Sequence, residues 1–121
     1  MGGAAVSVNL VRRANRDDHV MRTFEIPACG GCMLTEPTAT HRKLFKEGRE
    51  VFFFDSPASF VGSIRSLLGN PAAREQAAHA ANIAVKKTGN RYDDRLVSIV
   101  QIAMSNRRTE NVQTPLYAVA R

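Results

Sequence analysis

The order of short apolar runs and helical segments restricts the fold of this chain more than any other feature. Three runs have the β-branched and aromatic composition of strands, "AAVSVNLV" (4–11), "CMLTE" (32–36) and "EVFFFD" (50–55). Helical segments separate them, and a helix between two strands is the usual crossover of a parallel pair. The sequence therefore predicts an α/β fold with a parallel sheet.

The segment between the first two strands predicts a helix. Asp17 or Asp18 can cap its start, and Pro27 removes a backbone donor near its end, so the helix should bend or stop at about Ala28. The pair Gly30–Gly31 is a helix C-terminal signal. The expected inner face consists of Val20, Met21, Phe24 and Ala28.

Four further helices are expected. Residues 40–48 should form a short helix that ends at Gly48. Ser56–Pro57 and Asn70–Pro71 each place a capping side chain before a proline, and residues 92–108 carry acids in the first turn and arginines in the last. The expected apolar faces are Phe60, Val61, Ile64, Leu67 and Leu68, then Ala77, Ala81, Ala84 and Val85, and finally Leu96, Ile99, Val100, Ala103 and Met104. Three strands are few for a parallel sheet, so the pattern is that of the second half of a doubly wound domain.

The composition is that of one ordinary globular domain. The chain has 121 residues, of which 44% are hydrophobic and 23% charged, and this balance does not favour disorder. No apolar run reaches the roughly 18 residues that a transmembrane helix needs. The N-terminus lacks the basic and apolar regions of a signal peptide, and two cysteines are too few for a disulfide framework. We therefore expect a cytoplasmic protein.

The chain is basic, with 17 Lys and Arg residues against 11 Asp and Glu and a net charge of +6. Such a charge can indicate a polyanionic partner. The charges are scattered, however, and the densest basic cluster (Arg12, Arg13 and Arg16) is followed at once by Asp17 and Asp18. This pattern fits a local anion site, such as one for a diphosphate, better than an extended groove for nucleic acid.

Cys29 and Cys32 have the C-x-x-C spacing of a redox or zinc site. A redox pair has its first cysteine at a helix N-terminus, where the dipole lowers the thiol pKa, but Cys29 is expected at a helix C-terminus. A structural zinc needs four ligands, and His41 is the nearest further candidate. We therefore expect two small buried residues beside a glycine turn, and no metal site.

Glu25 has two interpretations. It can be a helix-surface carboxylate paired with Arg22 one turn away. It can also belong to a ligand site, because open α/β sheets bind ligands at the carboxyl ends of their strands, and the helix start near Asp18 would face an anion. A carboxylate at Glu25 would accept hydrogen bonds from a ribose diol, and the Asp17-x7-Glu25 spacing puts both acids on one side of the helix start.

A longer run carries a family resemblance. Residues 9–64, "NLVRRANRDDHVMRTFEIPACGGCMLTEPTATHRKLFKEGREVFFFDSPASFVGSI", contain an Asn–Arg–Asp loop, "RTFEIPACGG", a "TE" strand end and "LFKEG-E", and Tyr92, Asp94 and Arg95 follow. In these features, over residues 6–100, the chain resembles the C-terminal domain of CgeB-like, spore-maturation-type glycosyltransferases, which have the GT-B fold of two Rossmann domains. The resemblance implies a Rossmann-like parallel sheet with flanking helices over residues 1–108, as part of a donor-binding domain, and an irregular tail over 109–121.

The resemblance also implies a nucleotide-sugar site. Glu25 would hold the ribose, Arg16 and Arg22 would lie near the diphosphate, Asp17 would lie near the transferred sugar, and His41 would lie near the donor. The alternative for His41 is a solvated histidine at a helix start. Gly30 and Gly31 would serve the turn and the packing.

The implied activity is transfer of a sugar from a nucleotide diphosphate donor to an unknown acceptor, without an obligatory metal or other cofactor. The acceptor site and the catalytic base would come from an N-terminal domain or a partner chain. We therefore expect this chain to be inactive alone and assign no catalytic residue to it. The alternative is a non-catalytic α/β interaction module whose bare sheet edge seeks a partner; a nucleic-acid-binding protein is a weaker one, with salt-dependent affinity.

Overall fold

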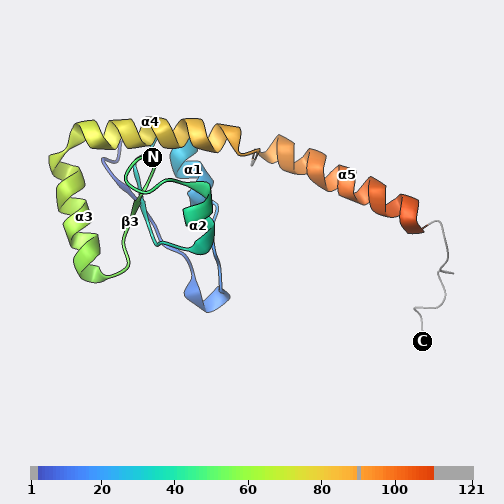
Figure 1. Cartoon of the computed structure of the whole chain (residues 1–121), viewed down its shortest axis with the longest axis horizontal. Helices are drawn as coiled ribbons and strands as arrows, with labels where there is room; N and C mark the ends of the chain where they lie inside the picture. The colour runs from blue at the N-terminus through green and yellow to red at the C-terminus, as the bar shows by residue number, and fades with distance from the viewer. Residues whose placement is uncertain (1–2, 90, 111–121) are drawn as a thin grey trace. The chain divides into compact units, whose positions relative to one another are not determined.

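The computed structural model describes residues 3–89 and 91–110. It divides into two units, Met1–Thr88 and Gly89–Arg121, and each is described by itself. The first unit contains the strands β1 (Ser7–Asn9), β2 (Met33–Thr35) and β3 (Phe52–Phe53), which form one parallel sheet in the order β1-β2-β3 (Figure 1). The predicted α/β fold with a parallel sheet is confirmed, although each strand is shorter than the run that predicted it.

Helices cover both faces of this sheet. They are α1 (Arg22–Ala28), α2 (Ala39–Leu44), α3 (Pro57–Gly69) and α4 (Pro71–Lys87), and Figure 1 shows α1 and α2 on one side of the strands and α3 on the other. Met33 packs with Ile26 and Phe45 on the α1/α2 side, whereas Cys32 packs with Leu67 and Ala78 on the α3/α4 side. Because successive side chains of a strand point to opposite faces, neighbouring residues serve two cores.

The first helix is shorter than predicted and turns a different face inward. α1 begins at Arg22, and Asp17 and Asp18 lie in the preceding loop. Its buried residues are Thr23, Ile26 and Pro27, whereas Met21 is 60% exposed and Ala28 is also exposed. The predicted start and inner face are therefore wrong. Thr23 is buried through polar contacts, and the spacing of apolar residues cannot reveal such a position.

The glycine pair after α1 ends the helix as predicted, and the structure requires glycine at the two positions for different reasons. Gly30 has a φ of 73°, in the left-handed region that glycine favours. Gly31 donates its N–H to the carbonyl oxygen of Ile26 at 2.9 Å, and a Cβ at Gly31 would lie 3.0 Å from Ile26 Cγ2. Asn82 of α4 then donates to the carbonyl oxygens of Pro27 and Ala28, each at 2.9 Å. The end of α1 is thus fixed against α4.

The second helix also ends early. α2 stops at Leu44 because Phe45 turns to an extended conformation (φ −134°, ψ 148°) and enters the core with 3% of its surface exposed. Gly48, the predicted stop, lies instead in the turn before β3, with a φ of 73° and its N–H donated to the carbonyl oxygen of Val51. The predicted helical end at Gly48 is wrong because an aromatic core residue intervenes.

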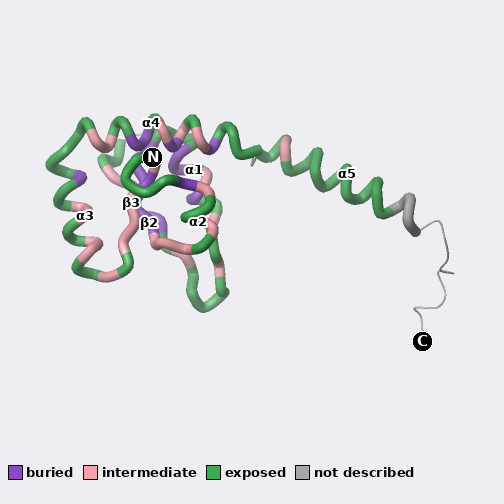
Figure 2. Tube along the Cα trace, viewed as in Figure 1, coloured by how far each residue is buried: buried purple, intermediate pink, exposed green. Residues whose placement is uncertain are grey.

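The two helices that begin with proline start where the sequence predicted. Ser56 and Ser59 form a reciprocal capping box at α3, and Asn70 accepts the N–H of Ala73 at α4. Three of the four residues predicted on the inner stripe of α4 are buried, and Ala84 is half-buried. On α3 only Leu67 is fully buried, and Val61 and Leu68 are exposed. Figure 2 shows this difference between the two helices.

The second unit contains the helix α5 (Tyr92–Glu110). It includes Thr109 and Glu110, which were expected in the irregular tail, and the rest of that tail (111–121) lies outside the described residues. The apolar side chains predicted to form its inner face are exposed, for example Leu96 at 60% and Ile99 at 61%. Among the residues that the structure describes, no helix is long and apolar enough to cross a bilayer.

Candidate functional site

The three strands end at one edge of the sheet, and the segments after them border several hollows, two of which contain predicted site residues. The first, which we call the α1 hollow, has a volume of about 810 Å³. Its lining residues come from the loop after β1 and from α1: Leu10, Arg12, Asp17, His19, Val20, Met21, Arg22, Phe24 and Glu25. It therefore lies at the carboxyl edge, where open α/β sheets bind their ligands.

The second hollow, which we call the β2 hollow, has a volume of about 390 Å³ and lies beside the residues that follow β2 and β3. It is lined by Val11, Arg13, Arg16, Asp17, Asp18, Glu36, Pro37, Thr38 and Asp55. Asp17 borders both hollows, so the loop that carries it separates them.

The structure brings together three of the five predicted site residues. Asp17, Arg22 and Glu25 line the α1 hollow, Arg16 lies in the adjacent β2 hollow, and His41 lines neither. In the described part of the chain no ion pair within 4.0 Å joins Arg22 to Glu25, although the sequence allowed such a pair. Both side chains are exposed, which leaves them available to a ligand.

The α1 hollow combines charge with apolar surface. Arg12 and Arg22 supply positive charge, and Asp17 and Glu25 supply carboxylates. Leu10 and Met21 are 61% and 60% exposed, and the rings of His19 and Phe24 meet edge to face with centroids 5.8 Å apart. A ligand with anionic groups, hydroxyl groups and an apolar or planar part matches this lining.

Arg16 sits on a strained turn. The short 3-10 helix η1 (Arg13–Asn15) precedes it, and Arg16 has a φ of 55° and a ψ of 33°, which is unusual for a residue with a Cβ. Its N–H donates to the carbonyl oxygen of Arg13, and the N–H of Asp17 donates to that of Arg12. This turn fixes where the loop presents Arg16 and Asp17 to the two hollows.

Glu36 was not predicted as a site residue, although it belongs to the "TE" strand end that the resemblance used. Its carboxylate accepts hydrogen bonds from Arg13 at 2.9 Å and from the backbone N–H of Val11 at 2.9 Å, and its side chain is 13% exposed. Glu36 therefore ties the loop after β1 to the end of β2. Its polar position directly after a strand was the signal that could have identified it.

His41 is buried, so the expectation of a solvated histidine at a helix start is wrong, and its place near the donor stays a prediction. It is 0% exposed and lies under the carboxyl edge between α1, β2 and α2. Its Nδ1 lies 2.8 Å from the carbonyl oxygen of Glu36, and its Nε2 lies 2.9 Å from Thr23 Oγ1. A single histidine in a helical segment gives the same sequence pattern whether it is buried or exposed, so the pattern could not predict the burial of His41.

The hydrogen bonds fix the form of the His41 ring. A carbonyl oxygen only accepts, so Nδ1 carries the hydrogen and donates it to Glu36. In the neutral ring Nε2 is then an acceptor, and the Thr23 hydroxyl donates to it. Burial lowers the pKa of His41 below its ordinary value, while the Glu36 carbonyl opposes that shift. The neutral ring is therefore the form that this environment favours.

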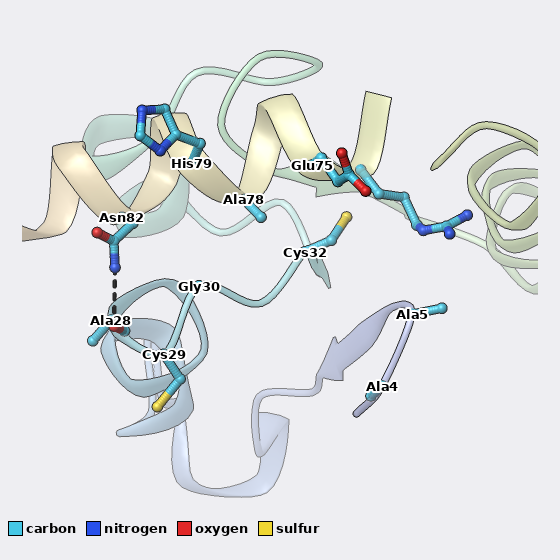
Figure 3. Close-up of a pocket in the computed structure, with 11 residues that line it drawn as sticks. Ala4, Ala5, Ala28, Cys29, Gly30, Cys32, Glu75, Ala78, His79 and Asn82 are labelled. Atoms are coloured by element: carbon cyan, nitrogen blue, oxygen red, sulfur yellow. Dashed lines mark hydrogen bonds between the residues drawn. The ribbon is translucent and has the colours of Figure 1, made fainter. Parts of the chain in front are cut away.

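The two cysteines of the C-x-x-C run lie at the opposite edge of the sheet. Cys29 is exposed, Cys32 is buried, and both are free thiols. Figure 3 shows their side chains pointing away from each other, beside a hollow of about 660 Å³ that Glu75 and Asn82 of α4 also line. Burial raises the pKa of the Cys32 thiol, which disfavours the thiolate that redox or metal chemistry needs. Within the ranges that the structure describes, no cluster of three or more His, Cys, Asp or Glu residues could hold a metal ion.

Comparison with known proteins gives one result that bears on this geometry. A search of curated proteins and a search of solved structures found no match. The model of a protein family described as "Glycosyl transferase-like" matches residues 1–101, which is most of the chain. A chain with this match and this parallel α/β sheet belongs to the glycosyl transferase-like family.

Proposed function

We propose that this chain binds the nucleotide-sugar donor of a glycosyltransferase in the α1 hollow. The observation that carries the proposal is the gathering of Asp17, Arg22 and Glu25 in one hollow at the carboxyl edge of the sheet, in a chain of the glycosyl transferase-like family. We further propose that the domain is the donor-binding part of a CgeB-like enzyme with the GT-B fold.

Five of the side chains that line the α1 hollow, and Arg16 beside it, have chemical roles in this proposal. Glu25 accepts hydrogen bonds from the two ribose hydroxyls, as a carboxylate can with its two oxygens. Arg22 binds the diphosphate through charge-assisted hydrogen bonds, with Arg16 on the neighbouring loop as a second cation. Asp17, which borders both hollows, faces the transferred sugar. The exposed apolar side chains of Leu10 and Met21 complete the lining and can contact a bound nucleotide.

The reaction of this class breaks the bond between the anomeric carbon of the sugar and the diphosphate oxygen, while the acceptor forms a new bond to that carbon. Negative charge grows on the leaving diphosphate, and preorganised cations stabilise such charge. We propose that Arg16 and Arg22 do so here, without an obligatory metal. Following the family resemblance, another domain or chain supplies the acceptor site and the base, so we expect no transfer from this chain alone.

One observation favours a second candidate, a non-catalytic interaction module. In the described sheet, β1 and β3 each pair on one side only. An unpaired strand edge is a ready template for another chain. Such a module would fold as this chain does and bind no nucleotide, so ligand binding separates the two candidates.

A thermal-shift panel tests the proposed function. UDP, GDP, ADP and TDP are added to the wild type and to Glu25→Ala. A ligand that binds only the folded state stabilises it by about 2.7 kcal/mol at a free concentration of about 100 Kd. We expect one nucleotide to raise the melting midpoint of the wild type and Glu25→Ala to abolish most of that rise.

Glu75→Ala is the matched control. Glu75 is also an exposed glutamate on a helix, but it lines the hollow at the opposite edge of the sheet. The rise should persist in this variant. A wild type that melts cooperatively and responds to none of the four nucleotides would refute donor binding and favour the interaction module.

A further inference from the structure

Four polar side chains lie completely buried beneath the α1 hollow. Asn9, Thr23, Thr35 and His41 are each 0% exposed. They come from four different elements, β1, α1, β2 and α2, and Asn9 is the register partner of Thr35. We call them the buried polar cluster. It joins the ends of two strands to the two helices that cover one face of the sheet.

Thr23 is the centre of the cluster. Its hydroxyl oxygen accepts hydrogen bonds from Asn9 Nδ2 at 3.1 Å and from the backbone N–H of Val20 at 3.3 Å, and its hydrogen goes to His41 Nε2 at 2.9 Å. A hydroxyl has one donor and two acceptor sites, so every site of Thr23 is used. The orientation of α1 at this point therefore depends on three partners at once.

The cluster is also retained at a cost. Asn9 Oδ1 is buried with no hydrogen-bond partner among the described residues. A buried acceptor without a partner destabilises the folded state. A cluster that served only stability would not need an unpaired buried acceptor. This unpaired acceptor is therefore an argument for a positioning role of the cluster.

Thr23 stands in α1 between the two predicted donor contacts, directly after Arg22 and two residues before Glu25. We propose that His41 is a positioning residue of the donor site: it reaches no ligand, but through the Thr23 hydroxyl it holds α1 so that Arg22 and Glu25 face the α1 hollow. This inference rests on the proposed function.

The form of the ring decides whether this contact exists. A protonated His41 would present an N–H at Nε2 to a Thr23 oxygen whose two acceptor sites are already occupied, so one partner of Thr23 would be displaced. The charged or titratable groups that act on the ring are Glu36, Asp18 and His19. Glu36 is engaged by Arg13, and Thr38 at the start of α2 binds the carbonyl oxygen of Asp18 at 2.6 Å. The surroundings of His41 are thus fixed on the side of α2 as well.

The test compares substitutions that remove one hydrogen bond at a time. Thr23→Val removes the hydroxyl and keeps the shape, and Thr23→Ser restores the hydroxyl. His41→Asn can still donate to the Glu36 carbonyl but lacks the acceptor that Thr23 uses. Leu67→Ala is the control, because Leu67 is buried in the other core, where it packs with Cys32 and Ala78, and lies outside the cluster. Dissociation constants for UDP, GDP, ADP and TDP are measured by calorimetry, and exchange of the α1 amides by mass spectrometry.

We expect Thr23→Val and His41→Asn each to weaken nucleotide binding about tenfold. The double variant should lose no more affinity than either single variant, because both substitutions act on one contact. Thr23→Ser should bind like the wild type, and Leu67→Ala should lose stability and keep its affinity. Equal affinity in all variants, or additive losses in the double variant, would overturn the inference. If the wild type binds none of the nucleotides, the proposed function fails. In that case, hydrogen exchange of the α1 amides that is unchanged in Thr23→Val would show separately that the cluster does not position this helix.

Discussion

At the scale of single residues, exposure separates the side chains that can meet a ligand from those that organise the site. Arg22 and Glu25 are exposed in the α1 hollow, and no ion pair joins them in the described part of the chain. Thr23, between them, is fully buried. Two exposed charged residues of α1 thus flank a buried polar one, and a sequence pattern shows only that all three are polar or charged.

The stability of the fold should depend on pH through His41. Its folded pKa is lowered by burial, whereas the unfolded chain has the ordinary value of about 6.5. Below that value the unfolded state binds more protons than the folded state, so the free energy of unfolding falls as pH drops below about 6.5 and is unaffected above it. Chemical denaturation between pH 7.5 and 5.5 measures this change.

Two histidine variants identify the source of that dependence. His41→Asn should flatten the curve because the buried titrating group is gone. His79→Gln should leave the curve as it is, since His79 is exposed on α4. A wild-type curve that is level from pH 7.5 to 5.5, or one that His79→Gln flattens, would contradict a neutral buried His41.

At the scale of elements, two glycines with different surroundings should respond oppositely to alanine. Gly31→Ala would place a Cβ 3.0 Å from Ile26 Cγ2 and 3.2 Å from the Ile26 carbonyl oxygen. We expect it to destabilise the fold by roughly 1–3 kcal/mol through overpacking. Gly62, inside α3, has nothing within 4 Å of its built Cβ, and Gly62→Ala should stabilise by about 1 kcal/mol through helix propensity.

Denaturant unfolding of both glycine variants at neutral pH gives these two values. Because the substitution is the same at both sites, opposite signs would show that Gly31 packs closely against Ile26 of α1. A Gly31→Ala variant as stable as the wild type would mean that the end of α1 does not lie where the structure has it.

The elements that the sequence predicted best are those with local signals. Ser56 and Asn70 cap α3 and α4 before a proline, and the alanines of α4 face inward at helical spacing. The start of α1 and the end of α2 were missed because their causes are distant in sequence. Thr23 is buried by Asn9 and His41, and Phe45 leaves the helix to fill the core beside Ile26 and Met33.

At the scale of the whole chain, the sheet of the first unit brings distant loops to one edge. The alternation of strands and helices predicted this parallel arrangement, and the family match over residues 1–101 agrees with it. The sequence also indicated that Asp17, Arg22 and Glu25 belong together. It could not place Arg16 in the neighbouring hollow or His41 beneath the site, because both depend on how the loops fold over the strand ends.

The most direct test of the central claim is to locate where a nucleotide binds. ¹⁵N-labelled protein is titrated with UDP, GDP, ADP and TDP, and shifts of the backbone amide signals are mapped on the sequence. We predict that one nucleotide shifts the amides of residues 17–25, most of which line the α1 hollow. The absence of any shift, or shifts confined to residues 29–32 and 74–82 around the hollow at the opposite edge, would contradict a donor site beside α1.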